Sequence, residues 1–169
     1  PAPYRIVFMA CPGETVVLSG GREITGWQSS GDDRWTVTLP EVASGAWYFR
    51  QLFVDGERLP RARHPNGEGL LRVKSVNDDV TEIVLNEAPP AEDLADQDAE
   101  LVVYQNWSIS RVKIRSSQGA TLHMENPVGW IGHGDMTTAS PGKPAFVENA
   151  LAFVNAPGEW YLDRKTGVL

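Results

Sequence analysis

Short runs of β-branched and aromatic residues alternate with glycine, proline, asparagine and aspartate along most of the chain, which is the pattern of β-strands joined by turns. Residues 35–39 show it most clearly, because Trp35, Val37 and Leu39 alternate with two threonines and therefore share one face of a half-buried strand. Asp55 and Gly56 form a turn pair of the kind that joins the strands of a hairpin. The predicted strands span residues 5–10, 15–19, 23–27, 35–39, 46–54, 57–62, 70–76, 81–85, 101–108, 110–116, 121–125 and 159–162.

Three segments depart from this strand pattern. Residues 87–100 contain two prolines followed by an acidic stretch, which predicts at most one helical turn. Residues 145–154 have an apolar spacing that fits a short helix as well as a strand, and residues 129–144 predict a long loop. We therefore predict an all-β fold, a barrel or sandwich of short antiparallel strands with at most one or two short helices.

The composition argues against two classes of binding partner, nucleic acids and membranes. The length of 169 residues suits one domain, and 15 Lys+Arg against 22 Asp+Glu give a net charge of −7. Such a charge argues against a protein that binds the nucleic-acid backbone, so we expect no nucleic-acid partner. No stretch approaches the roughly 20 apolar residues that cross a bilayer, so we expect no membrane partner.

Cysteine and histidine content argues against a disulfide framework and a metal site. The one cysteine, Cys11, is interpreted as a buried thiol at the end of a strand. The histidines His64, His123 and His133 lack the spacing of zinc ligands. We expect no cofactor and no metal.

Carboxylates are weak candidates for catalysis. Glycoside hydrolysis needs one carboxyl with a raised pKa opposite a second that stays ionised. Most acidic residues lie in predicted turns, where aspartate bonds its own backbone; Glu125, Glu148 and Glu159 have apolar neighbours. A small stand-alone hydrolase or lyase that uses Arg63, His64 and either Glu125 or Glu148 is one alternative.

One basic stretch stands out in this acidic chain. Arg50, Arg58, Arg61 and Arg63 fall within residues 50–63, and His64 follows directly. Guanidinium groups bind carboxylates or sugar hydroxyls; alternatively, these arginines pair with the acidic turns and pack their stems. Both interpretations stay open, and the candidate ligand residues from this stretch are Arg50, Arg61, Arg63 and His64.

The chain has six tryptophans, more than its five phenylalanines or four tyrosines. Indole faces stack on sugars, whereas burial in the core is the alternative use of such a large apolar group. We assign to the core, for the most part, the tryptophans of apolar strands, Trp35, Trp47, Trp107 and Trp160. Trp130 in the long loop, with Trp27, remains a candidate sugar platform. Trp107 and Arg111 join Trp130 among the candidate ligand residues.

Four phrases occur in an order that resembles the insertion domain of right-handed parallel β-helix proteins similar to glycoside hydrolase family 141. They are residues 12–21 with 24–27, residues 50–58 with 61–63, the segment that carries Val103, Tyr104, Trp107, Ser110, Arg111 and Ile114, and residues 147–149 with 157–163. The resemblance implies leading β-helix strands at residues 1–27, a β-barrel-like insertion domain at 28–159 and a return toward the β-helix at 160–169. Both ends of the sequence are expected to be clipped edges of a larger protein.

The resemblance also implies a function. The expected role is a non-catalytic, carbohydrate-binding or cleft-walling domain of a secreted bacterial enzyme, extracellular or periplasmic, that degrades plant polysaccharides such as xylan or pectin. The partners implied are a polysaccharide and the rest of the parent enzyme. Its catalytic carboxylates are expected on later coils, so no catalytic residue is assigned in this chain. A purely structural domain without a ligand is the alternative, and exposed strand edges predict a homodimer formed by strand addition.

Overall fold

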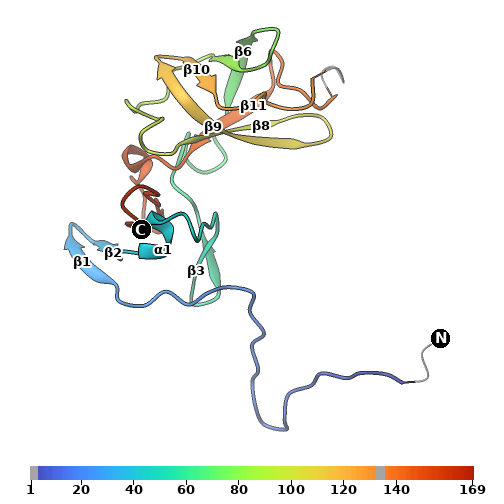
Figure 1. The fold of residues 1–169 in the computed structure, drawn as a ribbon, viewed down its shortest axis with the longest axis vertical. Coiled ribbons are helices and arrows are strands. Elements are labelled where there is room, and N and C mark those ends of the chain that lie inside the picture. The colour runs from blue at the N-terminus through green and yellow to red at the C-terminus, as the bar shows by residue number, and fades with distance from the viewer. Residues whose placement is uncertain (1–3, 132–135) are drawn as a thin grey trace. The chain divides into compact units, whose positions relative to one another are not determined.

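The computed structural model describes residues 4–131 and 136–169 (Figure 1). It is all-β, as the sequence predicts, and its helices are short: α1 spans Pro40–Ala43 and the 3-10 turn η2 spans Leu151–Phe153. The chain divides into two compact units, Pro1–Val37 and Thr38–Leu169, which are described separately.

The first unit contains one hairpin. Strand β1 (Gln28–Gly31) pairs antiparallel with β2 (Arg34–Thr36). The assignment of Trp35 to the core is wrong, since its side chain is 63% exposed. A two-stranded hairpin offers no second layer within its own unit to cover an indole.

The residues before this hairpin do not form the strands that their composition predicts. Residues 4–27 contain no strand, so the strands expected at 5–10, 15–19 and 23–27 are wrong for this structure. A strand needs backbone partners, and none pairs with this segment among the described residues. Its apolar side chains Ile6, Phe8 and Leu18 are exposed, and Cys11, expected to be buried, is exposed as well.

The second unit is built around a closed antiparallel barrel. Its strands are β6 (Leu71–Val76), β7 (Glu82–Leu85), β8 (Glu100–Tyr104), β9 (Ile109–Gln118), β10 (Thr121–Met124) and β11 (Pro144–Glu148). They follow the order β11–β6–β7–β10–β9–β8, and pairing of β8 with β11 closes the ring. Closure removes the free edges that an open sheet would present.

This unit also contains two smaller strand features. Strand β5 (Arg63–His64) pairs with the second half of β11. Strands β3 (Leu52–Val54) and β4 (Glu57–Leu59) form the hairpin predicted from Asp55 and Gly56. Both turn residues have positive φ, 51° and 83°, as a type I′ turn requires, so that prediction is confirmed.

The barrel interior is filled by aliphatic side chains that alternate along the strands. Those less than 3% exposed include Leu71, Val73, Ile83, Leu85, Leu101, Val103, Ile114, Leu122, Ala145 and Val147. The ambiguous segment 145–154 resolves into β11 followed by η2. Trp160 is buried as expected, whereas the assignment of Trp107 to the core is wrong, because the chain leaves β8 at Tyr104 and turns.

Candidate functional site

Strand alternation sends polar and aromatic side chains to the outside of the barrel. Leu101 and Val103 face the core from β8, so Glu100, Val102 and Tyr104 face outward. In β11, Phe146 and Glu148 stand directly opposite Val102 and Glu100. We call this surface the outer β8–β11 face and define it by Glu100, Tyr104, Phe146, Glu148 and the arginines that contact or approach them, Arg50, Arg61, Arg63 and Arg111.

Arg61 occupies the centre of the outer β8–β11 face. Its side chain is 5% exposed, and Nη1 lies 2.6 Å from Glu100 Oε2 and 2.8 Å from Glu148 Oε1. Nε donates to Asn149 Oδ1 at 3.2 Å, and Nη2 donates to the Tyr48 hydroxyl at 2.8 Å. Arg61 therefore holds two adjacent buried carboxylates together, and all three of its guanidinium nitrogens are engaged.

Arg50 and Arg111 bind the same carboxylates from the rim of the face. Arg50 Nη2 lies 2.5 Å from Glu100 Oε1, and its Nε lies 3.0 Å from Oε2, so the contact is bidentate. Arg111 donates from Nε to Glu148 Oε1 at 2.7 Å, and its side chain is 37% exposed. Its two terminal nitrogens have no hydrogen-bond partner among the residues that the structure describes.

Arg63 lies over an aromatic ring rather than a carboxylate. Its guanidinium carbon is 3.6 Å from the centroid of the Phe146 ring, which is a cation–π contact. Nε donates to the Pro65 carbonyl at 3.0 Å and Nη2 to the Gly69 carbonyl at 2.7 Å. Burial lowers the pKa of Arg63. An arginine nevertheless stays protonated, so Arg63 carries a positive charge without an ion-pair partner in the described chain.

Glu100 is a poor candidate for a general acid. Burial by itself would raise the pKa of Glu100, but hydrogen bonds from Arg50 and Arg61 outweigh it and hold that pKa below its ordinary value. A glycosidase acid needs a raised pKa instead. Glu148 accepts hydrogen bonds from two guanidinium groups, so the two carboxylates and their arginines form a structural ion network.

Two exposed tryptophans lie beyond one end of the face. Trp107, 76% exposed, is in the turn between β8 and β9, and its backbone N–H donates to the Met136 carbonyl at 3.2 Å. Trp130, 72% exposed as predicted, donates its backbone N–H to the Thr137 carbonyl at 2.9 Å. Both tryptophans therefore border the same short backbone segment. Lys143 Nζ donates a hydrogen bond to Asn106 Oδ1 at 2.8 Å and thereby links the β8–β9 turn to the residue before β11.

His64 lies apart from these residues. It pairs with Val147, which faces the core, so its ring is on the inner side of β5 and packs 5.8 Å from Phe153. Its Nε2 is buried without a partner in the described chain, and burial lowers its pKa. His133, the other loop histidine, lies outside the described residues.

The structure thus brings Arg50, Arg61, Arg63 and Arg111 together, although they come from distant segments. It places the backbones of Trp107 and Trp130 against the two neighbouring carbonyls of Met136 and Thr137, and it leaves His64 apart. The sequence interpretation missed Tyr48, Glu100 and the Tyr104–Phe146 ring pair, whose centroids are 6.0 Å apart. Side chains alternate between the two faces of a strand, so a strand at residues 100–104 with Leu101 and Val103 in the core would have predicted that Glu100 and Tyr104 face outward.

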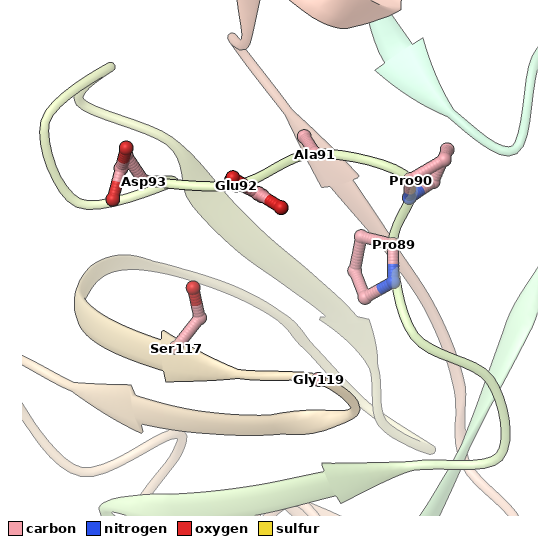
Figure 2. Close-up of a pocket in the computed structure, with 7 residues that line it drawn as sticks. All are labelled: Pro89, Pro90, Ala91, Glu92, Asp93, Ser117 and Gly119. Atoms are coloured by element: carbon pink, nitrogen blue, oxygen red, sulfur yellow. The ribbon is translucent and has the colours of Figure 1, made fainter.

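A separate groove of about 630 Å³ opens at the far end of β9. Pro89 to Asp93 line one side of it, and Ser117 and Gly119 line the other (Figure 2). Six residues of strand separate Ser117 from Arg111, or about 20 Å at the usual rise. None of the candidate ligand residues lines this groove, whose charged side chains are acidic.

The residues that the structure describes lack two further features. They contain no group of three His, Cys, Asp or Glu side chains arranged to hold a metal ion. Nor do they contain a helix of the length and apolarity needed to cross a membrane.

Comparison with known proteins identifies the family. A solved structure named "Glycoside hydrolase" superposes with a TM-score of 0.65 at 22% identity, a likeness that shows the fold alone. The match covers 89% of this chain and 28% of that one, so the chain spans little more than a quarter of that hydrolase. No curated protein matches significantly. The model of the GH141 insertion domain matches residues 32–169, and the chain therefore belongs to the GH141 insertion domain family.

Proposed function

We propose that this chain is a non-catalytic accessory domain of a glycoside hydrolase and that it contacts glycan through Trp107 and the adjoining outer β8–β11 face. The observation that carries the proposal is the exposure of Trp107 in the turn that continues directly from Tyr104. A large exposed indole is a flat apolar surface on which a sugar ring can stack. Trp130 is also exposed and, like Trp107, hydrogen-bonds to the backbone at residues 136–137, so it extends that surface.

The charged groups support contact rather than cleavage. Glu100 and Glu148 are ionised partners of arginines, which favours an accessory role over a stand-alone hydrolase. Arg111 keeps terminal N–H groups near the surface that can donate to sugar hydroxyls.

The parent enzyme forms part of the same proposal. The family is named as an insertion domain, and the solved relative is named as a hydrolase of greater length. We propose that residues 1–27 and 160–169 belong to its β-helix. Exposed apolar residues such as Phe8 and Leu18 support this assignment for the first segment, because neighbouring coils would cover them. Xylan or pectin as the substrate, and a location outside the cytoplasm, follow from the resemblance.

A purely structural role is the second candidate function. It is favoured by the fully engaged Arg61, whose network ties β8 and β11 to Tyr48 and Asn149. On that account the exposed tryptophans would contact the parent enzyme rather than glycan.

Affinity electrophoresis of the 169-residue chain in gels that contain soluble xylan, pectin or β-glucan distinguishes the two roles. We expect at least one glycan to retard the chain, and Trp107→Ala to weaken that binding by roughly tenfold, the effect of about 1.4 kcal/mol of lost stacking. Trp35→Ala is the matched control, because it removes an exposed indole from the other unit. Retardation by none of the three glycans, or retardation that Trp107→Ala leaves unchanged, would leave the structural role.

A further inference from the structure

We propose that the outer β8–β11 face recognises a carboxylated saccharide and that Arg111 is its principal carboxylate receptor. This inference rests on the proposed function, because it names the class of glycan that the same surface takes. The class is a glycan that bears uronate residues, as opposed to a neutral chain.

The outer β8–β11 face carries more positive than negative charge. Glu100 is shared between Arg50 and Arg61, and Glu148 between Arg61 and Arg111. Arg63 contacts neither carboxylate within ion-pair distance. Four guanidinium groups therefore surround two carboxylates, which leaves a local surplus of two positive charges in a chain whose net charge is −7. Such a surface attracts an anion where the rest of the protein repels it.

Arg111 is held in place by one of its three guanidinium nitrogens. Its Nε is fixed on Glu148 at 2.7 Å, while the two terminal nitrogens have no partner among the described residues. An arginine fork binds a carboxylate through paired parallel hydrogen bonds. Because Glu148 already orients this side chain, less conformational entropy is lost when a ligand binds.

Arg63 lies along the same part of β11 as Arg111. Its guanidinium lies over Phe146, and Arg111 reaches Glu148, two residues further along β11. Two residues of strand span about 7 Å, so both cations lie against one short stretch of β11. Tyr104 stacks near Phe146 at the side that leads to the β8–β9 turn. A sugar chain that stacks on Trp107 would pass this pair of cations.

Lys143 continues the positive surface toward that turn. Its described hydrogen-bond partner is the neutral Asn106, so its charge adds to that of the arginines. By contrast, the groove at the other end of β9 is lined by Glu92 and Asp93, which would repel a uronate. Charge therefore selects the outer β8–β11 face over the groove for an acidic glycan.

The test is isothermal titration calorimetry of the 169-residue chain with three oligosaccharides. They are tetragalacturonate, the same tetrasaccharide with its carboxylates methyl-esterified, and neutral xylotetraose. We expect tetragalacturonate to bind about tenfold or more tightly than its ester, because a charge-assisted bidentate contact exceeds a neutral one by at least that factor. Raising the salt concentration should weaken only the acidic ligand.

Variants assign the effect to Arg111. Arg111→Gln should lower affinity for tetragalacturonate about tenfold and leave the ester unaffected, and Arg111→Lys should restore only part of it, since lysine keeps the charge and lacks the fork. Arg115→Gln is the matched control: it removes an equal charge from the same strand, further from the face. Circular dichroism melts confirm that each variant is folded.

The outcomes separate this inference from the proposed function. Equal affinity for the acid and its ester, or acid binding that Arg111→Gln leaves unchanged, overturns the inference. If the neutral ligands then still bind in a Trp107-dependent manner, the accessory glycan-binding function stands without it. Binding of none of the three ligands here, together with failure of every glycan in the gels, overturns both.

Discussion

Arg61 and Arg111 bind the same oxygen of Glu148 from the centre and the rim of one face, and their surroundings give them different roles. The Arg61 side chain is 5% exposed and uses every guanidinium nitrogen on protein atoms, whereas the Arg111 side chain is 37% exposed and uses one. A buried charge must be fully paired to be tolerated. An exposed arginine has no such requirement, so its remaining donors are available to a ligand. The same residue type thus stabilises the fold at the centre and offers recognition at the rim.

The largest expected effect is at the centre. Arg61→Ala should lower the free energy of unfolding by about 3–5 kcal/mol, because it leaves Glu100 and Glu148 buried side by side with less compensation. Urea denaturation followed by tryptophan fluorescence measures this loss. A loss below about 1 kcal/mol would mean that water reaches the two carboxylates.

The second-largest effect is expected at low pH, where the ion pairs of Glu100 with Arg50 and Arg61 should stabilise the fold less. The folded-state pKa of Glu100 is below the ordinary glutamate value of about 4.5, so its ionised form stabilises the fold. That contribution is complete above about pH 4.5 and is lost as the pH falls through the lower folded-state pKa. The melting temperature should therefore drop between pH 5 and pH 3, and Glu100→Gln should flatten the drop. Parallel pH profiles for the two proteins would show that other groups cause it.

The rim should contribute least to stability. Arg111→Gln should change the free energy of unfolding by less than about 1 kcal/mol, since Glu148 keeps its bond to Arg61 and exposed ion pairs contribute little. Urea denaturation followed by tryptophan fluorescence measures this change as well. If Arg111→Gln lowered the free energy of unfolding as much as Arg61→Ala does, Arg111 would be as important for stability as Arg61, contrary to this prediction.

Local signals in the sequence predicted much of the second unit. The Asp55-Gly56 turn and the strand-like runs at 70–76 and 81–85 each carry their own structure, because turn chemistry and side-chain period act over a few residues. The strands expected in residues 4–27 failed for the opposite reason. Their composition favours extended structure, but a strand forms only where another backbone accepts its hydrogen bonds.

The site was harder to predict than the fold. The turn that exposes Trp107 contains neither glycine nor proline, so residues 101–108 read as one strand. Arg61 is 39 residues from Glu100 and 87 from Glu148 in sequence, and only barrel closure brings them together. The sequence shows that Arg50, Arg61 and Arg63 lie close together along the chain. Which of them is buried and which is exposed depends on how β5, β8 and β11 pair, and the sequence does not show that pairing.

The most direct test of the account follows the tryptophan indole and arginine Nε–H signals of the 169-residue chain by NMR during titration with tetragalacturonate. If a carboxylated glycan binds the outer β8–β11 face, the Trp107 indole and the Arg111 Nε–H signals should shift, while the buried Trp160 and Trp35, which belongs to the other unit, stay unchanged. Shifts confined to other residues, or no shifts at millimolar ligand, would contradict it.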